Sequence, residues 1–351
     1  MIDIKLTDTM VQIQKKLNKG GNICFQYGIY NITKQLILKA GTYITLNGST
    51  LRRSADIQSI FINDCTAKTK GYKGAGKITI LNGTFEGMGK YAPDNLLTFF
   101  HSHDIHIEGV TFLDNRCHAI ELNATKDVEV IRCKFLGCNT AQPYQEAIQI
   151  DAAYAKGFFK AGSTVNSKCY DGTVCSNINI ENCTFDKSNF RKRPSACIGT
   201  HTQILGGARH TGIKIFNNTF NCDELGNCLS FIGMEDVRVL SNYFKHCGRI
   251  ARIYNKEYSY DLKGNQVKPQ NSDGVCKDIL FYDNLEQYAG EENKCVGIYA
   301  ISVSDPHEDI QVVSNQFIKS NDYEKYYLYT EHCKDVIDEK NRTQLKSRIN
   351  P

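Results

Sequence analysis

Two short segments of the sequence carry carboxylates in the same alternating pattern. Residues 117–123 read CHAIELN, and residues 146–151 read EAIQID. Apolar residues alternate with polar ones in both segments, as in a β-strand with one buried face, so Glu121 and Asp151 are predicted to point outward. Two carboxylates can break a glycosidic bond when one protonates the leaving oxygen and the other activates water. Acid–base chemistry on a sugar is therefore the first hypothesis.

The offset between the two segments sets the distance between these carboxylates. If the segments are neighbouring parallel strands, Glu121 lies beside Gln149 and Asn123 lies beside Asp151. Strands pack about 4.8 Å apart and alternate residues of one strand are about 6.7 Å apart, so Glu121 and Asp151 are about 8 Å apart on the diagonal. That separation suits an inverting glycosidase, for which about 6.5 to 9.5 Å is expected. Side-chain reach leaves a retaining geometry open, and which carboxylate is the acid stays undecided.

Other polar residues predicted on the same face are candidates for binding the substrate. They are His118, Asn123, Gln149, His201, Arg252 and Tyr254. Glu146 is expected beside His118, and it is a third catalytic candidate if the alternation is shifted by one residue. The segment CIGTH at 197–201 would form the next strand, where Gly199 would leave room for a ligand. A solvated polar face without function is the competing interpretation.

Two long insertions beside these strands carry aromatic residues. These residues are Tyr154, Phe158, Phe159, Tyr170 and Phe190. They could stack on the apolar faces of sugar rings, or they could only pack the insertions onto the core. Tyr299 is a weaker candidate for the same face. The chain has no tryptophan, which counts against a tight glycan-binding module.

The elements that position these residues follow from an internal repeat. Eight segments alternate β-branched and polar residues and end in a large apolar residue: ITILNGTF at Phe85, IHIEGVTF at Phe112, VEVIRCKF at Phe135, INIENCTF at Phe185, IKIFNNTF at Phe220, VRVLSNYF at Phe244, ILFYDNL at Leu285 and IQVVSNQF at Phe317. A base unit of about 23 to 27 residues with inserted loops accounts for the spacing. One unit cannot bury its apolar face, whereas stacked units form a continuous core. The sequence therefore predicts an all-β chain folded as a right-handed parallel β-helix, since a β-sandwich would not repeat the same turn and the same Phe.

Small hydrogen-bonding residues recur two positions before most of these large apolar residues. They are Cys133, Cys183, Asn218, Asn242, Asp283 and Asn315. Stacked coils use such residues to satisfy the backbone groups of a shared turn, and we expect the same here.

The two ends of the chain differ from the repeat. Residues 8–17 are predicted to form an amphipathic helix with Met10, Ile13 and Leu17 on one face. A helix at this end would cover strand edges that otherwise invite aggregation. We therefore assign residues 1–320 to the β-helix with its N-terminal cap, and the polar residues 321–351 to a C-terminal cap and tail.

Composition excludes several classes of protein. Of the 351 residues, 41% are hydrophobic and 23% are charged, and the net charge of +4 is spread without long blocks, so nucleic acid is not an expected partner. No run approaches the roughly 18 apolar residues that insertion into a membrane needs. The fifteen cysteines are odd in number and no signal peptide is apparent. We therefore expect mostly reduced cysteines and a cytoplasmic or virion-associated protein, with another export route left open.

With the predicted strands and their polar face taken together, residues 5–320 resemble the pectate-lyase-like superfamily and, within it, the polygalacturonase-type glycoside hydrolases. The 146–151 segment stands where those enzymes have an N-T-D strand. Gly199-Thr200-His201 is similar to their G-H-G motif with the histidine displaced, and Arg252-Ile253-Tyr254 is similar to R-I-K without the lysine. The Asp-Asp pair of those enzymes is missing. The resemblance implies hydrolysis of a polysaccharide or oligosaccharide other than pectin, without a cofactor.

Two other functions stay open at this stage. A polysaccharide lyase would need calcium and a basic residue to take a proton, and no lysine or arginine is predicted next to Glu121 or Asp151 on the face of these strands. A noncatalytic glycan- or receptor-binding β-helix, such as a phage tail protein, is the alternative from another class. Phage depolymerases form a related group, and assembly into a homotrimer is left open.

Overall fold

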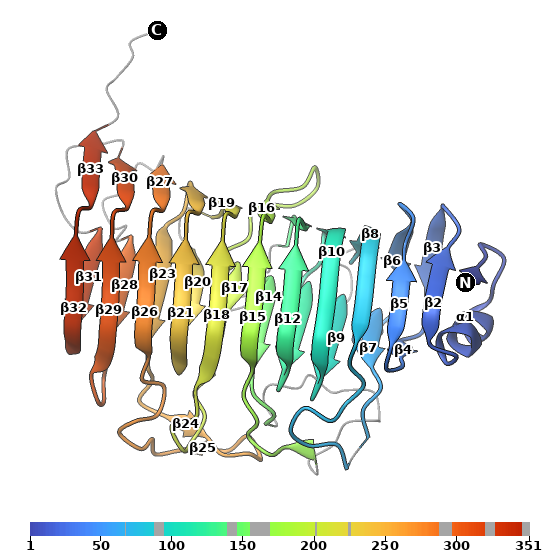
Figure 1. Ribbon diagram of the computed structural model, residues 1–351, viewed down its shortest axis with the longest axis horizontal. Helices are drawn as coiled ribbons and strands as arrows, with labels where there is room; N and C mark the ends of the chain where they lie inside the picture. The colour runs from blue at the N-terminus through green and yellow to red at the C-terminus, as the bar shows by residue number, and fades with distance from the viewer. Residues whose placement is uncertain are drawn as a thin grey trace, which may run out of the picture.

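The chain is a right-handed parallel β-helix, as the repeat predicts. The computed structural model describes residues 1–66, 68–87, 95–138, 146–154, 169–200, 202–223, 226–287, 297–319 and 327–345. Successive coils stack along one axis, from the blue N-terminal coils to the red C-terminal coils (Figure 1). Among the described residues, one sheet contains 21 strands and a second contains 10, and we call them sheet A and sheet B.

Sheet A is built from two rows of parallel strands. The first row comprises β1 (Ile2–Ile4), β2 (Gly21–Phe25), β5 (Thr42–Thr45), β8 (Ile78–Glu86), β10 (His103–Leu113), β12 (Lys126–Ile131), β15 (Ser176–Glu181), β18 (His210–Phe216), β21 (Met234–Leu240), β26 (Lys277–Tyr282), β29 (His307–Val313) and β32 (Cys333–Glu339). The second row comprises β3 (Ile29–Ile32), β6 (Thr50–Arg53), β13 (Lys134–Leu136), β16 (Thr184–Asp186), β19 (Thr219–Asn221), β22 (Tyr243–Lys245), β27 (Leu285–Gln287), β30 (Gln316–Lys319) and β33 (Arg342–Leu345). The long strands β8 and β10 run through both rows.

Sheet B forms the opposite wall of the coils and carries the candidate site. Its strands are β4 (Leu36–Leu38), β7 (Phe61–Asn63), β9 (Leu97–Phe100), β11 (Ile120–Asn123), β14 (Ile148–Asp151), β17 (Ile198–Gly199), β20 (Asn227–Phe231), β23 (Arg249–Tyr254), β28 (Ile298–Ile301) and β31 (Leu328–Glu331). A small antiparallel pair, β24 (Ser259–Tyr260) and β25 (Gln266–Val267), lies in a loop below the coils in Figure 1.

The recurring Phe residues form one stacked column inside the coils. From Phe112 to Phe244 neighbouring rings lie 4.5–4.9 Å apart between centroids, and every one of them is buried. The seventh copy differs from the prediction by one residue, because Phe244 pairs with Glu286 and not with Leu285. Glu286 in turn pairs with Phe317, so a buried glutamate replaces the ring in this coil.

A ladder of asparagines stabilises the turn before the Phe column. It consists of Asn218, Asn242, Asn284, Asn315 and Asn341. Each side-chain oxygen from Asn242 onward accepts the backbone N–H of the preceding member, at 2.8–2.9 Å. Each amide nitrogen donates to a backbone carbonyl of an earlier coil, so turn groups without a strand partner are satisfied.

The predicted turn residue Asp283 is not part of this ladder. Its neighbour Asn284 is part of the ladder, because this coil is displaced by one residue relative to the predicted repeat. Asp283 lies at the outer bend instead, with a left-handed backbone at φ 55°.

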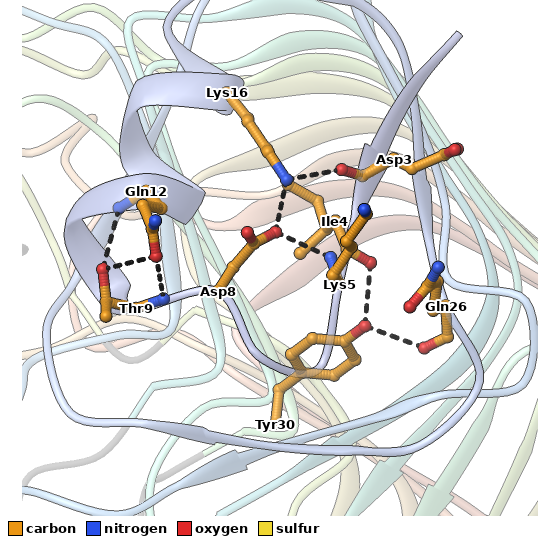
Figure 2. A network of polar contacts seen from close by, with 9 residues as sticks. All are labelled: Asp3, Ile4, Lys5, Asp8, Thr9, Gln12, Lys16, Gln26 and Tyr30. Carbon is orange, nitrogen blue, oxygen red and sulfur yellow. Dashed lines mark hydrogen bonds and ion pairs between the residues drawn. The ribbon is translucent and has the colours of Figure 1, made fainter.

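The N-terminal cap has the predicted helix, α1 (Met10–Leu17). Ile13 and Leu17 are buried and Met10 packs against the same core, so the predicted apolar face is confirmed. Thr9 and Gln12 form a capping box at the helix start (Figure 2).

A polar network ties this helix to the first coil (Figure 2). Lys16 Nζ donates to Asp8 Oδ2 at 2.5 Å and to the Asp3 carbonyl at 2.7 Å. Burial opposes ionisation of Asp8, but hydrogen bonds from Lys16 and from the Lys5 backbone outweigh it and lower the pKa of this carboxyl. The Tyr30 hydroxyl lies between the backbone carbonyls of Ile4 in the cap and Gln26 in the first coil, at 3.0 and 2.8 Å, and its proton is shared between them. Burial raises the pKa of Tyr30 to about 12.

The coils continue beyond residue 320, where the sequence analysis ended them. β31, β32 and β33 pair in parallel with β28, β29 and β30 and complete a further coil up to Leu345. The sequence did not predict this coil because its strands lack the alternating apolar pattern. Many side chains of β31 and β32 are exposed at the end of the stack and are polar.

The cysteines contribute mainly buried thiols to the core. Cys222 and Cys228 form a disulfide, whereas the other described cysteines are free and mostly buried. Whether these thiols are reduced in the protein's own environment stays a prediction.

Candidate functional site

Strands β11, β14 and β17 lie side by side in the register that the sequence predicts. Glu121 pairs with Gln149, and Asn123 pairs with Asp151. Gln149 pairs in turn with Gly199 on the next coil. Glu121 and Asp151 are therefore diagonal neighbours on adjacent parallel strands of sheet B.

The outward face of these strands is covered, although the alternation predicted an open polar face. Glu121 and Asp151 each expose 1% of their surface, and Gln149 exposes 2%. Asn123 is fully buried, and neither polar atom of its side chain has a hydrogen-bond partner among the described residues. A buried polar side chain without partners carries a free-energy cost, which a ligand or an ordered water at this face would remove.

Local backbone pairing explains part of this cover. Ala153, just after β14, donates to the Thr173 carbonyl and accepts from the Gly172 N–H, both at 2.9 Å. These bonds hold the chain after β14 against the coil, so Ala152, Ala153 and Tyr154 are themselves buried.

Glu121 is held by neutral donors on the preceding coil. Its Oε2 accepts from Asn95 Nδ2 and, at 3.3 Å, from Thr98 Oγ1. Asn95 also accepts the backbone N–H of His118. The predicted neighbours His118 and Glu146 do meet, but through the backbone, since His118 Nδ1 donates to the Glu146 carbonyl at 2.6 Å. His118 is thereby fixed in one tautomer.

Asp151 is likewise oriented by neutral side chains. Thr200 Oγ1 donates to its Oδ1 at 2.7 Å, and Gln149 Nε2 donates to its Oδ2. Gln149, a predicted substrate-binding residue, thus orients a catalytic candidate within the same strand. Its own Oε1 is buried and has no partner in the described part of the chain.

Gly199 does not open space for a ligand as the sequence analysis expected. A Cβ atom added there would lie 2.0 Å from the Ser230 carbonyl oxygen. The backbone of β20 therefore occupies the room that the missing side chain leaves. The glycine is required by coil packing, and that part of the prediction is wrong.

Lys256 belongs to this site and was missed by sequence reasoning. It follows β23, and it lies close enough to Asp151 and Glu146 for their charges to act on it. Burial lowers its pKa, the nearby Arg252 lowers it further, and the two carboxylates oppose both effects. The sequence offered no signal, because Lys256 is more than 100 residues from the carboxylates and outside the alternating pattern.

Tyr154, just after β14, is a buried side chain close enough to Asp151 for the charge of that carboxylate to act on it. Burial raises its pKa well above the usual value, and the charge of Asp151 raises it further. It packs with Tyr260 at 6.2 Å between ring centroids. The sequence left open whether this aromatic ring stacks on a sugar or packs onto the coil. In the structure it is buried and packs onto the coil.

Some of the remaining predicted residues are described by the structure and others are not. Arg252 and Tyr254 lie together on β23, with the guanidinium carbon 3.8 Å from the ring centroid. Tyr170 packs against a small cluster that includes Cys169, whereas Phe190 is 87% exposed. The positions predicted at His201, Phe158 and Phe159 lie outside the described residues.

Among the described residues, one cluster has side chains close enough to hold a metal ion. It consists of the buried cysteines Cys197, Cys222 and Cys228, but Cys222 and Cys228 are joined in the disulfide, so only Cys197 offers a free thiol there. Within the ranges that the structure describes, no helix is long and apolar enough to cross a membrane.

The chain is similar to one curated protein. No family model matches the sequence. Plasmin and fibronectin-binding protein A of Streptococcus pneumoniae is 25% identical over 333 residues, in a match that covers 84% of this chain and 45% of that protein. The chain therefore spans less than half the length of the relative it matches.

Solved structures with the same fold include an adhesin and an enzyme. PfbA, a surface adhesin of Streptococcus pneumoniae, superposes with a TM-score of 0.77 at 21% identity, covering 97% of this chain and 84% of that one. A hyperthermoactive exopolygalacturonase from Thermotoga maritima gives 0.56 at 12% identity, covering 99% and 91%. At these identities the likeness establishes the right-handed parallel β-helix fold and no more.

Proposed function

Starting from this pectate-lyase-like β-helix, we propose that the chain is a carbohydrate-active enzyme that hydrolyses a glycosidic bond with Glu121 and Asp151. The observation that carries the proposal is the diagonal pairing of these two carboxylates on β11 and β14. Diagonal neighbours on adjacent strands are about 7 to 8 Å apart between backbone positions. A water molecule fits between carboxylates at that spacing, as inversion requires.

In this reaction the two carboxyl groups exchange protons with the substrate and water. One carboxylic acid gives its proton to the glycosidic oxygen as the bond to the anomeric carbon breaks. The other carboxylate takes a proton from water as the water oxygen attacks that carbon. Neutral donors such as Thr200 and Thr98 orient the oxygens without supplying a positive charge that would hold both groups ionised.

Lys256 would add a cation to the side of the site that holds Asp151 and Glu146. A nearby positive charge favours the ionised form of a carboxyl group. This asymmetry supports Asp151 as the base and Glu121 as the acid. Glu146 stays a third candidate for a catalytic carboxylate.

A noncatalytic glycan-binding protein is the second candidate function. It is favoured by the burial of both carboxylates, because a substrate reaches them only if covering side chains such as Tyr154 move. The similarity to a surface adhesin also supports it. Lys256 also supports a lyase. A lyase needs a basic residue near the carboxylates to take a proton, and the sequence had not predicted one there.

The experiment is digestion of a polysaccharide panel, read by mass spectrometry, with wild type, Asp151→Asn and Glu121→Gln. New reducing ends that fall at least about 100-fold in both variants support the hydrolase, given the usual weight of an acid–base group. Glu129→Gln on sheet A is the matched control, because this exposed carboxylate lies on another face.

Folding of each variant is checked by its thermal midpoint. Binding without cleavage, unchanged in both variants, would overturn the enzyme and leave the adhesin-like function. Unsaturated products that vanish with a calcium chelator would point to the lyase instead.

A further inference from the structure

We propose that four cysteines inside the coils form an oxidative modification site, which takes up a second disulfide when a small thiol oxidant reaches it as the coils open. The site consists of Cys197, Cys222, Cys228 and Cys247, and we call it the sulfur chain. Oxidation would replace the Cys222–Cys228 disulfide by two others, Cys197–Cys222 and Cys228–Cys247. The sulfur chain is independent of the proposed hydrolase, because no carboxylate takes part in it.

The four cysteines gather at one corner of the coils, between the second row of sheet A and sheet B. Cys222 and Cys247 follow β19 and β22, which are paired neighbours in the second row. Cys197 directly precedes β17 and Cys228 lies in β20, and these two strands are paired neighbours in sheet B. Two successive coils therefore each contribute one cysteine from either side of the corner, and all four side chains are buried.

Each sulfur of the disulfide has a thiol beside it. Cys197 Sγ lies 3.1 Å from Cys222 Sγ, and Cys247 Sγ lies 3.5 Å from Cys228 Sγ. The distance from Cys197 Sγ to Cys228 Sγ is longer, at 3.9 Å. A disulfide forms only between cysteines whose sulfurs meet without a large backbone movement. Both alternative pairs satisfy this condition, because their sulfurs are already in contact.

The chemistry is one thiol–disulfide exchange followed by one oxidation. Cys197 loses its proton and its sulfur bonds to Cys222, while the bond from Cys222 to Cys228 breaks and its electron pair leaves on Cys228, which takes up the proton. This exchange needs no oxidant, because it makes one disulfide and breaks one. A peroxide or azo oxidant then accepts two electrons and two protons from the Cys228 and Cys247 thiols, and these two sulfurs become bonded.

Burial prevents this exchange while the coils are closed. The attacking group in thiol–disulfide exchange is a thiolate. Burial raises the pKa of both Cys197 and Cys247 above that of an ordinary thiol, so both stay protonated at neutral pH. An oxidant also has no path to sulfurs whose residues are 0% exposed. The pairing therefore changes only when the coils open locally, and it is fixed again when they close.

Two disulfides would restrain the chain more than one. The Cys222–Cys228 disulfide has a sequence separation of 6, whereas the two new pairs have separations of 25 and 19. Each new disulfide would close one complete turn of the β-helix into a ring. A longer closed loop removes more conformational freedom from the unfolded chain. The oxidised protein should therefore unfold at a higher urea concentration.

The test treats the folded protein with diamide, a small azo oxidant, at urea concentrations from zero to just below the unfolding midpoint. Free thiols are then trapped with N-ethylmaleimide, and tryptic peptides are identified by mass spectrometry. No lysine or arginine lies between Cys222 and Cys228, so their disulfide stays within one peptide. Both new disulfides would link separate peptides, since trypsin cuts at Arg209 and at Arg238.

Two variants examine the new pairs one at a time. Cys228→Ala leaves Cys222 without its partner, so diamide should produce the Cys197–Cys222 disulfide. Cys222→Ala should produce the Cys228–Cys247 disulfide for the same reason. Cys276→Ala is the matched control, because it removes a buried free cysteine from another coil and should give the same linked peptides as wild type. Thermal midpoints identify variants that fail to fold.

Linked peptides that appear only with urea, together with a higher urea midpoint after the urea is removed, support the sulfur chain. A Cys222–Cys228 disulfide that persists alone at every urea concentration overturns it. Variants in which the released cysteine stays a thiol, or pairs with a cysteine outside the sulfur chain, overturn it as well. Linked peptides that form equally fast without urea would contradict the protection by burial.

Discussion

At the scale of single residues, His210 and His307 occupy equivalent places at the start of a sheet A strand. The Nδ1 of each accepts the backbone N–H of a cysteine on the preceding coil, at 3.0 and 3.1 Å. Burial lowers the pKa of both histidines to about 4. A protonated ring could not accept that hydrogen bond, so both side chains are built to stay neutral.

These histidines predict a loss of stability in mild acid. The unfolded chain takes up their protons at a pKa of about 6.5 and the folded chain only near pH 4, so the stabilisation is complete above about pH 6.5 and falls as the pH drops toward 4. Each histidine accounts for up to about 3 kcal/mol of that loss. Urea unfolding at pH 7.5 and 5.0 should show a smaller loss between the two values in His210→Gln than in wild type. Equal losses would contradict the assignment.

Gly199 predicts a steric cost at the centre of the candidate site. Its φ is +151° and an added Cβ would meet the Ser230 carbonyl at 2.0 Å, so Gly199→Ala should lower the unfolding free energy by well over 1 kcal/mol. Gly206→Ala is the control, because Gly206 also has a positive φ but nothing lies within 4 Å of the added atom. Similar midpoints in urea for both variants would mean that Ser230 can move aside, and a ligand could then use that space.

At the scale of elements, the asparagine ladder joins one turn of each coil to the next. Asn242 supplies the acceptor for the backbone N–H of Asn218 and donates to the Ile215 carbonyl, both at 2.9 Å. Because these backbone groups are buried, their partners cannot be replaced by water without opening the coil.

Replacing one asparagine of this ladder should cause a large and local loss of stability. Asn242→Ala leaves two buried backbone groups without partners, at a cost of about 1 to 3 kcal/mol for each. Lys214→Ala, an exposed change on the neighbouring coil, should stay within about 0.5 kcal/mol. Hydrogen exchange should also speed up for the Asn218 amide in Asn242→Ala. A variant as stable as Lys214→Ala would show that the ladder does not hold the turns.

At the scale of the whole molecule, a stack of parallel strands has two open ends. α1 and β1 close the first end, and the network around Asp8, Lys16 and Tyr30 fastens them to the coil (Figure 2). Without them, β2 would present unpaired backbone groups to other molecules.

Deletion of residues 1–20 should therefore cause association through the exposed edge. Light scattering after gel filtration should show concentration-dependent aggregates for the truncated chain. Thr9→Ala removes only the capping-box hydroxyl, costs about 1 kcal/mol, and should leave the oligomeric state unchanged. A truncated chain with the same mass in solution as the full chain would contradict this role of the cap.

The alternation of apolar and polar residues was enough to predict the β-helix and the register of the candidate strands. Both depend on local periodicity, which places Glu121 beside Gln149 and stacks the Phe residues coil upon coil. The one-residue shift at Glu286 escaped detection because a buried glutamate breaks the apolar pattern that the alignment relied on.

The surroundings of the carboxylates could not be predicted from the sequence, because they depend on how distant segments pack together. Periodicity says which face of a strand a side chain lies on, but it does not say which distant segment covers that face. Tyr154 and Lys256 reach the site from loops, and their order in the sequence gives no distance to Asp151. Burial, the pKa of Lys256 and the pairing of the final coil depend on contacts between segments far apart in the chain, and those contacts form only when the coils stack.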